Sequence, residues 1–128
     1  MKILIIDDSP TNMKLVSFFM IQAEYDILEA NNAACGIALA REKQPDMILL
    51  DIQLPGMDGM TAARLLKNDP LTRHVPVIAM TAFAMPGDQE RFIAAGCDAY
   101  IAKPIRYKKL LKMVDSFLKN GQEKLVSS

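Results

Sequence analysis

The sequence predicts an α/β fold in which five parallel strands alternate with five helices in a doubly wound, three-layer arrangement. Five short apolar runs recur along 128 residues, and segments with helical spacing or helix-start residues separate them. The runs are continuous rather than alternating, which is typical of strands buried on both faces of a parallel sheet. Because crossover connections between parallel strands are right-handed, the helices are expected to cover both faces of that sheet.

The length of the chain is that of one ordinary domain. A domain of 128 residues buries about two-thirds of the surface of its unfolded chain, without help from disulfides or structural metal. We assign residues 1–119 to this domain and residues 120–128 to a polar C-terminal tail. Nine residues are too few for a DNA-binding or catalytic domain, so output is expected from the surface of the domain itself.

Composition narrows the classes of partner and the location. Fifteen Lys and Arg residues balance fifteen Asp and Glu residues, so no overall charge draws the protein to nucleic acid or to an anionic membrane. The first apolar run, Ile3 to Ile6, is too short for a signal peptide or a membrane span, which favours a cytoplasmic protein without membrane insertion. Cys35 and Cys97 lack metal-ligand spacing and are expected to be buried free thiols.

The first strand, at residues 3–6, stops at Asp7-Asp8. Ser9 is the expected N-cap of a helix that runs to about residue 23, with Pro10 at its first position. Four residues at helical spacing are expected to form its buried stripe: Leu15, Val16, Phe19 and Ala23. Three further apolar side chains lie off that stripe: Met13, Phe18 and Ile21. They indicate either a wide core face or an exposed docking patch for a partner helix.

The third strand ends in a carboxylate. A second strand at residues 26–30 and a helix that starts after Asn32 precede the apolar run 47–50, which Asp51 follows. Pro55-Gly56 then predicts a tight turn. Asp51 is therefore expected outside the carboxyl end of a central strand, where open α/β sheets bind their ligands.

The fourth strand, at residues 77–80, ends in a hydroxyl, that of Thr81. The helix before it, at about residues 59–68, is expected to face inward through Leu65 and Leu66.

The fifth strand, at residues 98–102, follows a helix that is expected to stop at Gly96, and it leads to Lys103. The last helix, at about residues 107–119, carries one apolar stripe: Leu110, Leu111, Val114, Phe117 and Leu118. Its basic run indicates a solvated face or, alternatively, a protein-docking face: Lys108, Lys109 and Lys112.

Five polar residues follow the ends of four parallel strands and are expected to meet at one edge of the sheet: Asp7, Asp8, Asp51, Thr81 and Lys103. Carboxylates packed together stay ionised only beside positive charge, which Mg²⁺ and Lys103 would supply. A carboxylate held in this way can attack a phosphoryl group and form an aspartyl phosphate, with Asp51 as the nucleophile. The metal, Lys103 and the Thr81 hydroxyl would then stabilise the phosphoryl oxygens.

These motifs resemble the receiver domain of two-component response regulators. The segments that carry the resemblance are Asp7-Asp8, Asp51 with Leu54-Pro-Gly-Met-Asp-Gly59, Thr81-Ala82 and Lys103-Pro104. The resemblance extends from about residue 2 to residue 119 and implies a flavodoxin-like sheet with strand order 2-1-3-4-5. The pattern at residues 8–12 and 83–85 is similar to that of single-domain regulators of the cell-cycle type and of receivers attached to hybrid kinases.

The resemblance implies a metal site around the phospho-acceptor. Asp51 would accept the phosphoryl group. Asp8, the Asp51 carboxylate and the backbone carbonyl of Gln53 would ligate Mg²⁺, and Asp7 would reach the metal through water.

The resemblance also implies a switch. Thr81 would move toward the phosphoryl group, and Tyr100 would report the two states by turning its ring inward or outward. The Lys103-Pro104 peptide bond would be cis, which aims the lysine at the site. Phe83 flanks the site and cannot position a water by hydrogen bonding, so a fairly long-lived phosphoryl group is expected.

The function that follows from the resemblance is that of a stand-alone response regulator, a phospho-acceptor switch rather than an enzyme acting on other substrates. The phosphoryl group would come from a histidine kinase or a histidine phosphotransfer protein, which would dock on Met13, Phe18 and Ile21. The phosphorylated surface would bind a downstream protein target, and the basic last helix could also serve a homodimer.

Three alternatives stay open from the residues alone. The chain could be a receiver excised from a hybrid kinase or a longer regulator. A Mg²⁺-dependent phosphatase with an aspartyl nucleophile needs a second acid, and Gln53 occupies the position two residues after Asp51. A flavin-binding module needs a Ser/Thr/Gly-rich phosphate loop after the first strand, and two acids stand there.

Overall fold

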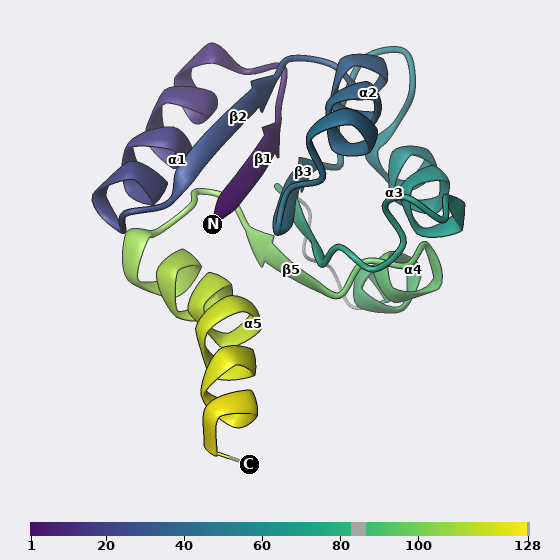
Figure 1. Cartoon of the computed structure of the whole chain (residues 1–128). Helices are drawn as coiled ribbons and strands as arrows, with labels where there is room; N and C mark the ends of the chain where they lie inside the picture. Colours follow the sequence, from purple (N-terminus) through teal and green to yellow (C-terminus); the bar gives the residue numbers. More distant parts are fainter. Residues whose placement is uncertain (83–86, 128) are drawn as a thin grey trace.

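A single parallel sheet of five strands forms the centre of the molecule (Figure 1). The computed structural model describes residues 1–82 and 87–127, with side chains through residue 118. The strands are β1 (Lys2–Ile6), β2 (Asp26–Ala30), β3 (Met47–Asp51), β4 (Val77–Thr81) and β5 (Ala99–Ala102). They pair in the order β2-β1-β3-β4-β5, which confirms the predicted order.

Helices cover both faces of the sheet, as a doubly wound fold requires. The helices are α1 (Pro10–Gln22), α2 (Ala33–Lys43), α3 (Gly59–Asn68), α4 (Asp88–Ala94) and α5 (Tyr107–Ser127). One core cluster joins α1 and α5 to one face of the sheet, and a second cluster joins α2, α3 and α4 to the other. Figure 1 shows the same division, with α1 and α5 on one side and α2, α3 and α4 on the other.

The central strands are sealed from solvent on both faces. Every residue of the runs Ile3–Ile6, Met47–Leu50 and Val77–Met80 has an exposed fraction of 0%. Burial on both faces of a parallel sheet therefore explains the continuous apolar runs, as the sequence predicted. Polar residues can approach this part of the core only where the strands end.

Capping residues set the helix starts at the positions predicted from the sequence. The Ser9 side chain accepts a hydrogen bond from the Asn12 backbone N–H, and the Asn32 and Asp58 side chains do the same for the second and third helices. After α4, Gly96 has φ +99°, a conformation that glycine adopts without a steric penalty.

Two of the leucines predicted to face inward are exposed. Leu15 on α1 is 38% exposed and Leu65 on α3 is 47% exposed, whereas their neighbours Val16 and Leu66 are fully buried. Adjacent residues on a helix point about 100° apart, so a large side chain at the edge of the buried stripe turns toward solvent while its neighbour faces the sheet. The predicted stripes were therefore too wide by one residue at these two places, whereas Val16 and Leu66 are buried and Phe19 and Ala23 pack against the core as predicted.

The apolar stripe of α5 is confirmed, since Leu110, Val114 and Leu118 are buried and Leu111 and Phe117 pack partly against the same cluster. The lysines of its basic run are exposed. The helix extends to Ser127, past residue 119, where the sequence suggested that it ends. Its last turns contain good helix formers such as Gln122, Glu123 and Leu125.

Of the two cysteines, Cys97 is a buried free thiol as predicted, but Cys35 is exposed on α2. Within the described part of the chain, no helix is long and apolar enough to cross a membrane. Phe83 and Met85, which belong to the pattern quoted above, lie outside the described residues.

Candidate functional site

The carboxyl ends of β1, β3 and β4 bring polar residues to one edge of the sheet. Asp51 is the last residue of β3 and pairs with Met80, while Thr81 ends β4 beside Ala102 of β5. Asp7 follows β1 and donates its backbone N–H to Ala30 at the end of β2. The parallel register therefore places side chains from distant parts of the chain at one edge.

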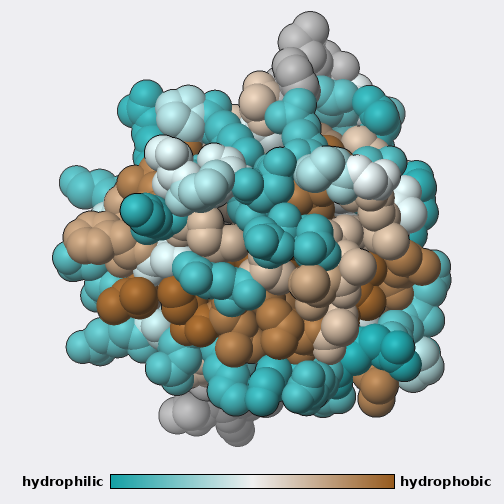
Figure 2. Space-filling view, turned by 90° about the horizontal axis from the view of Figure 1, so that it is seen from above, coloured by the Kyte–Doolittle hydropathy of each residue, from teal (hydrophilic) through white to brown (hydrophobic). Residues whose placement is uncertain are grey.

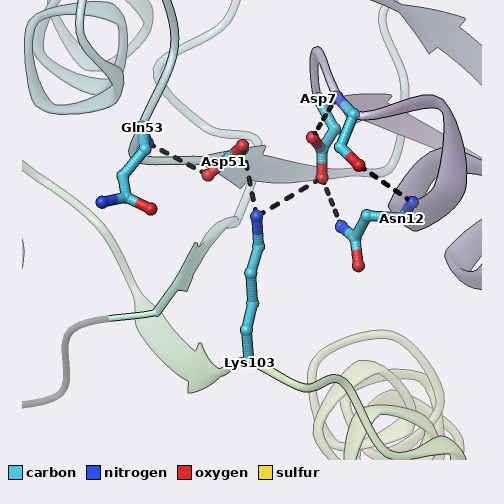
Figure 3. A network of polar contacts seen from close by, with 6 residues as sticks. Asp7, Asn12, Asp51, Gln53 and Lys103 are labelled. Carbon is cyan, nitrogen blue, oxygen red and sulfur yellow. Dashed lines mark hydrogen bonds and ion pairs between the residues drawn. The ribbon is translucent and has the colours of Figure 1, made fainter.

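Asp51 is buried, with an exposed fraction of 2%. Its Oδ1 accepts the backbone N–H of Gln53 at 3.0 Å, and its Oδ2 lies 3.3 Å from the Lys103 Nζ (Figure 3). Burial raises the pKa of the Asp51 carboxyl to about 6, and the charge of Asp7 adds to this, whereas the Gln53 N–H and Lys103 act in the opposite direction. Ionisation of Asp51 therefore costs free energy in the folded protein.

Asp7 is held on both of its carboxylate oxygens. The Ser9 backbone N–H donates to Oδ1 at 2.9 Å, and the Asn12 side-chain amide donates to Oδ2. The Lys103 Nζ lies 3.8 Å from the same Oδ2. Figure 3 shows Lys103 reaching up between Asp7 and Asp51 and Asn12 approaching Asp7 from its far side. Asn12 was not among the predicted site residues.

Asp7, Asp8 and Asp51 together form a group that could hold a metal ion. One carboxylate oxygen from each lies within 4.8 Å of the other two. Asp7 and Asp51 are buried and Asp8 is exposed, so the group opens to solvent on the Asp8 side. Three carboxylates are a donor set of hard oxygens, which is the kind that Mg²⁺ prefers over nitrogen or sulfur ligands. The residues present therefore fit a magnesium ion.

Lys103 is positioned by the end of β5. Its backbone N–H donates to the Thr81 carbonyl at 2.7 Å, and the Lys103-Pro104 bond is cis, the geometry that the resemblance implied. Thr81 itself is 1% exposed and belongs to the same edge. The Gln53 side chain is exposed and points away from Asp7 in Figure 3, so only its backbone faces the site.

Tyr100 lies on β5, away from the carboxylates. Its ring is half-buried and packs at a tilt of 48° on Phe92 of α4, with 5.6 Å between the ring centroids. Tyr100, Phe92 and the exposed Ile93 line a cavity of ≈ 240 Å³ between α4 and β5. The aromatic ring therefore has free space beside it on this face.

The three apolar residues predicted as a docking patch do not share one environment. Phe18 and Ile21 are 56% and 58% exposed, but Met13 is half-buried and packs against the core. Other large apolar residues are exposed as well, among them Ile93. Figure 2 shows hydrophobic side chains gathered in a band between hydrophilic ones on the face seen from above. Exposure alone therefore does not single out α1.

The model of the response regulator receiver domain matches residues 3–115. The polar-differentiation response regulator DivK of Brucella anthropi is 43% identical over 116 residues, which cover 91% of this chain and 94% of that protein. The DivK of Brucella ovis is 42% identical over the same shares.

Solved structures show the same fold. The receiver domain of a sensor histidine kinase from Pseudomonas aeruginosa PAO1, with a magnesium ion in its active-site cleft, has a TM-score of 0.84 and 30% identity, covering 91% of this chain and 95% of that one. A putative response regulator from Chloroflexus aurantiacus has a TM-score of 0.87 and 27% identity, covering 92% and 97%.

Proposed function

The chain belongs to the response regulator receiver domain family, and from this premise we propose that it is a stand-alone switch phosphorylated on Asp51. The observation that carries the proposal is a buried carboxylate that contacts Lys103 and lies beside two further acids. Members of this family are phospho-acceptor signalling proteins rather than enzymes with a separate substrate. The match to DivK of Brucella anthropi covers 94% of that protein, which is a response regulator, and this supports the proposal.

Phosphoryl transfer to Asp51 needs an ionised nucleophile and positive charge around the phosphoryl oxygens. With a pKa of about 6, the Asp51 carboxylate is ionised at neutral pH and can attack phosphorus while the bond to the donor's leaving group breaks. Mg²⁺, held by Asp8, Asp51 and the Gln53 carbonyl, would neutralise part of the charge on the transferring group. Lys103 offers a second cation, 3.3 Å from Asp51, and the Thr81 hydroxyl offers a hydrogen-bond donor.

The switch would act through the α4–β5–α5 face. A phosphoryl group on Asp51 would draw the Thr81 hydroxyl inward, and the space left behind would favour an inward Tyr100 ring. The cavity beside Tyr100 and the exposed Ile93 support this proposal, because a change of the ring alters a surface that a protein target can contact. The lysines of α5 border this face, and a homodimer through α5 is one form that the output could take.

The donor would be a histidine kinase or a histidine phosphotransfer protein in the cytoplasm, docking beside α1. Phe18, Phe19 and Gln22 line a groove of ≈ 250 Å³ together with Tyr107 at the start of α5. The Phe19 ring packs on Tyr107 with 5.2 Å between centroids, which fixes the floor of the groove. Phe18 and Ile21 stand exposed on α1, whereas Met13 is too buried to contribute much area.

The proposed chemistry predicts a Mg²⁺-dependent phosphoryl gain. After incubation with acetyl phosphate and Mg²⁺, the intact mass of the protein is expected to rise by one phosphoryl group, and omission of Mg²⁺ with a chelator present is expected to prevent the gain. Intact-mass spectrometry measures both. An unchanged mass with Mg²⁺ present would contradict the proposed function.

The docking proposal predicts that Phe18→Asp slows phosphotransfer from a phosphorylated histidine phosphotransfer protein by at least about tenfold, since buried aromatic residues dominate protein interfaces. Phosphorylation by acetyl phosphate requires no docking and is expected to keep its wild-type rate. Leu65→Asp is a matched control, because Leu65 is an exposed apolar residue on α3. Equal slowing by Phe18→Asp and Leu65→Asp would rule out α1 as the docking surface.

A receiver segment of a hybrid kinase is the second candidate. The receiver of the Pseudomonas sensor kinase, at 30% identity and a TM-score of 0.84, favours it. The site chemistry is the same for both candidates. They differ in whether the native protein carries a kinase on the same chain. The molecular mass of the native protein in a cell extract distinguishes the two.

A further inference from the structure

The first turn of α1 wraps around Asp7. Ser9 caps the helix, and its hydroxyl oxygen accepts the Asn12 backbone N–H at 3.2 Å. The Ser9 backbone N–H donates to Asp7 Oδ1, and the Asn12 side-chain amide donates to Asp7 Oδ2. One turn of helix therefore supplies a donor to each oxygen of the same carboxylate, as Figure 3 shows for Asn12.

This arrangement departs from the ordinary capping box. In that motif the side chain three residues after the N-cap reaches back and accepts the N-cap backbone N–H. Asn12 occupies that position, but here the N–H of Ser9 is taken by Asp7. The Asn12 side chain therefore does not accept the Ser9 N–H. Its amide instead donates a hydrogen bond to Asp7.

The two donors restrict what Asp7 can do. A carboxylate has two oxygens with about four acceptor positions. Asp7 is 1% exposed and uses both oxygens on protein donors, whereas Asp8 is exposed. Asp7 also lies 3.8 Å from the Lys103 ammonium, which is 3.3 Å from Asp51. Asn12 therefore holds the same Asp7 oxygen, Oδ2, that faces Lys103, and an Asp7 side chain without this donor would be free to rotate.

We propose that Asn12 is a positioning residue, which fixes the Asp7 carboxylate in the orientation that it has at the cation site. A neutral amide suits this position because a Glu or Asp there would add another negative charge to three clustered acids. The proposal rests on the proposed function, since the cation in question is the Mg²⁺ of the phosphorylation site. Residues that orient a carboxylate ligand in this way affect metal affinity without touching the metal.

Calorimetric titration of the full chain with MgCl₂ tests the proposal directly. Asn12→Leu, which matches the shape of asparagine but lacks the donor, is expected to weaken Mg²⁺ binding about tenfold, within the range for partners of metal ligands. Asn12→Gln keeps an amide donor and is expected to recover most of that loss. Thr11→Ala, an exposed position in the same turn, is expected to bind Mg²⁺ like the wild type.

Thermal unfolding without Mg²⁺ accompanies each titration, and Asn12→Ala is measured in parallel in case the leucine variant does not fold. The proposal is overturned if the folded Leu and Ala variants bind Mg²⁺ within about twofold of the wild type, a smaller change than orienting residues produce. That result leaves the proposed function intact, because the wild type still binds the metal. A wild type that shows neither a heat of binding nor a higher unfolding temperature with Mg²⁺ overturns both proposals.

Discussion

Asp51→Asn is expected to abolish the Mg²⁺-dependent phosphoryl gain from acetyl phosphate completely. The side-chain amide of asparagine does not attack phosphorus as a carboxylate does, and no acyl phosphate can form on it. Intact-mass spectrometry after incubation with acetyl phosphate and Mg²⁺ measures the loss. Asp26→Asn, at an exposed position at the start of β2, is the matched control and is expected to gain one phosphoryl group. A gain in the Asp51→Asn variant would mean that another residue accepts the group.

The same substitution is expected to stabilise the fold near neutral pH. The pKa of Asp51 is raised from 3.8 to about 6 in the folded protein, so ionisation costs folding free energy at pH 7. At 1.36 kcal/mol per pKa unit the cost is at most about 3 kcal/mol, and loss of the Lys103 contact offsets part of the gain. We expect the variant to be more stable by about 1–3 kcal/mol near pH 7.

The change of this stability difference with pH tests whether ionisation of Asp51 causes it. Below the unfolded pKa, Asp51 is protonated in both the folded and the unfolded wild type, and the penalty disappears. The stability difference between variant and wild type is therefore expected to shrink as the pH falls from about 6 toward about 4. Urea unfolding at several pH values in the absence of Mg²⁺ measures it. A difference that does not vary with pH would show that Asp51 ionisation is not its source.

Gly59→Ala is expected to lower the free energy of unfolding by about 3 kcal/mol, the upper end for overpacking. A Cβ atom at Gly59 would lie 2.4 Å from the Ile52 Cα and 2.6 Å from the Asp51 carbonyl oxygen. Both are backbone atoms, so no side-chain rotation can relieve the contact. The Gly59 N–H also donates to the Ile52 carbonyl at 2.9 Å, which ties the start of α3 to the end of β3.

The displaced backbone is the one that carries Asp51, so slower phosphorylation by acetyl phosphate is expected along with the loss of stability. Gly56→Ala, in the same loop, is the matched control. Gly56 has φ +82° and no atom within 4 Å of an added Cβ, so alanine there costs only about 1–2 kcal/mol of backbone strain. Equal destabilisation by the two substitutions would contradict the packing argument.

Most of the fold could be predicted because the strand signals are unambiguous. The runs at residues 3–6, 47–50 and 77–80 are apolar without interruption, and the acids or hydroxyl that follow them fix where each strand ends. The site edge then follows from topology, since all carboxyl ends of a parallel sheet point the same way. The helix phase was less certain, because Leu15-Val16 and Leu65-Leu66 place two apolar residues at neighbouring positions.

Asn12 escaped prediction for a different reason. Ser9 was the expected N-cap, and an asparagine three residues later, in the first turn of the helix, is ordinarily explained as part of the same capping arrangement. The available signal was the spacing, since a serine N-cap with an amide three residues later suggests a reciprocal pair. Asn12 donates to Asp7 because of the angle between β1 and α1, and no local sequence pattern encodes that angle.

The site also depends on residues that are made at different times. Its three carboxylates come from the first half of the chain, whereas Lys103, which contacts two of them, follows Asp51 by 52 residues. At about 5–20 residues per second, the ribosome needs roughly 3–10 s to add that stretch. During this interval β1 and β3 can meet only by bringing like charges together without their lysine. A nascent chain that ends before Lys103 can therefore pair β1 with β3, but it lacks the cation that lies between Asp7 and Asp51 in the finished site.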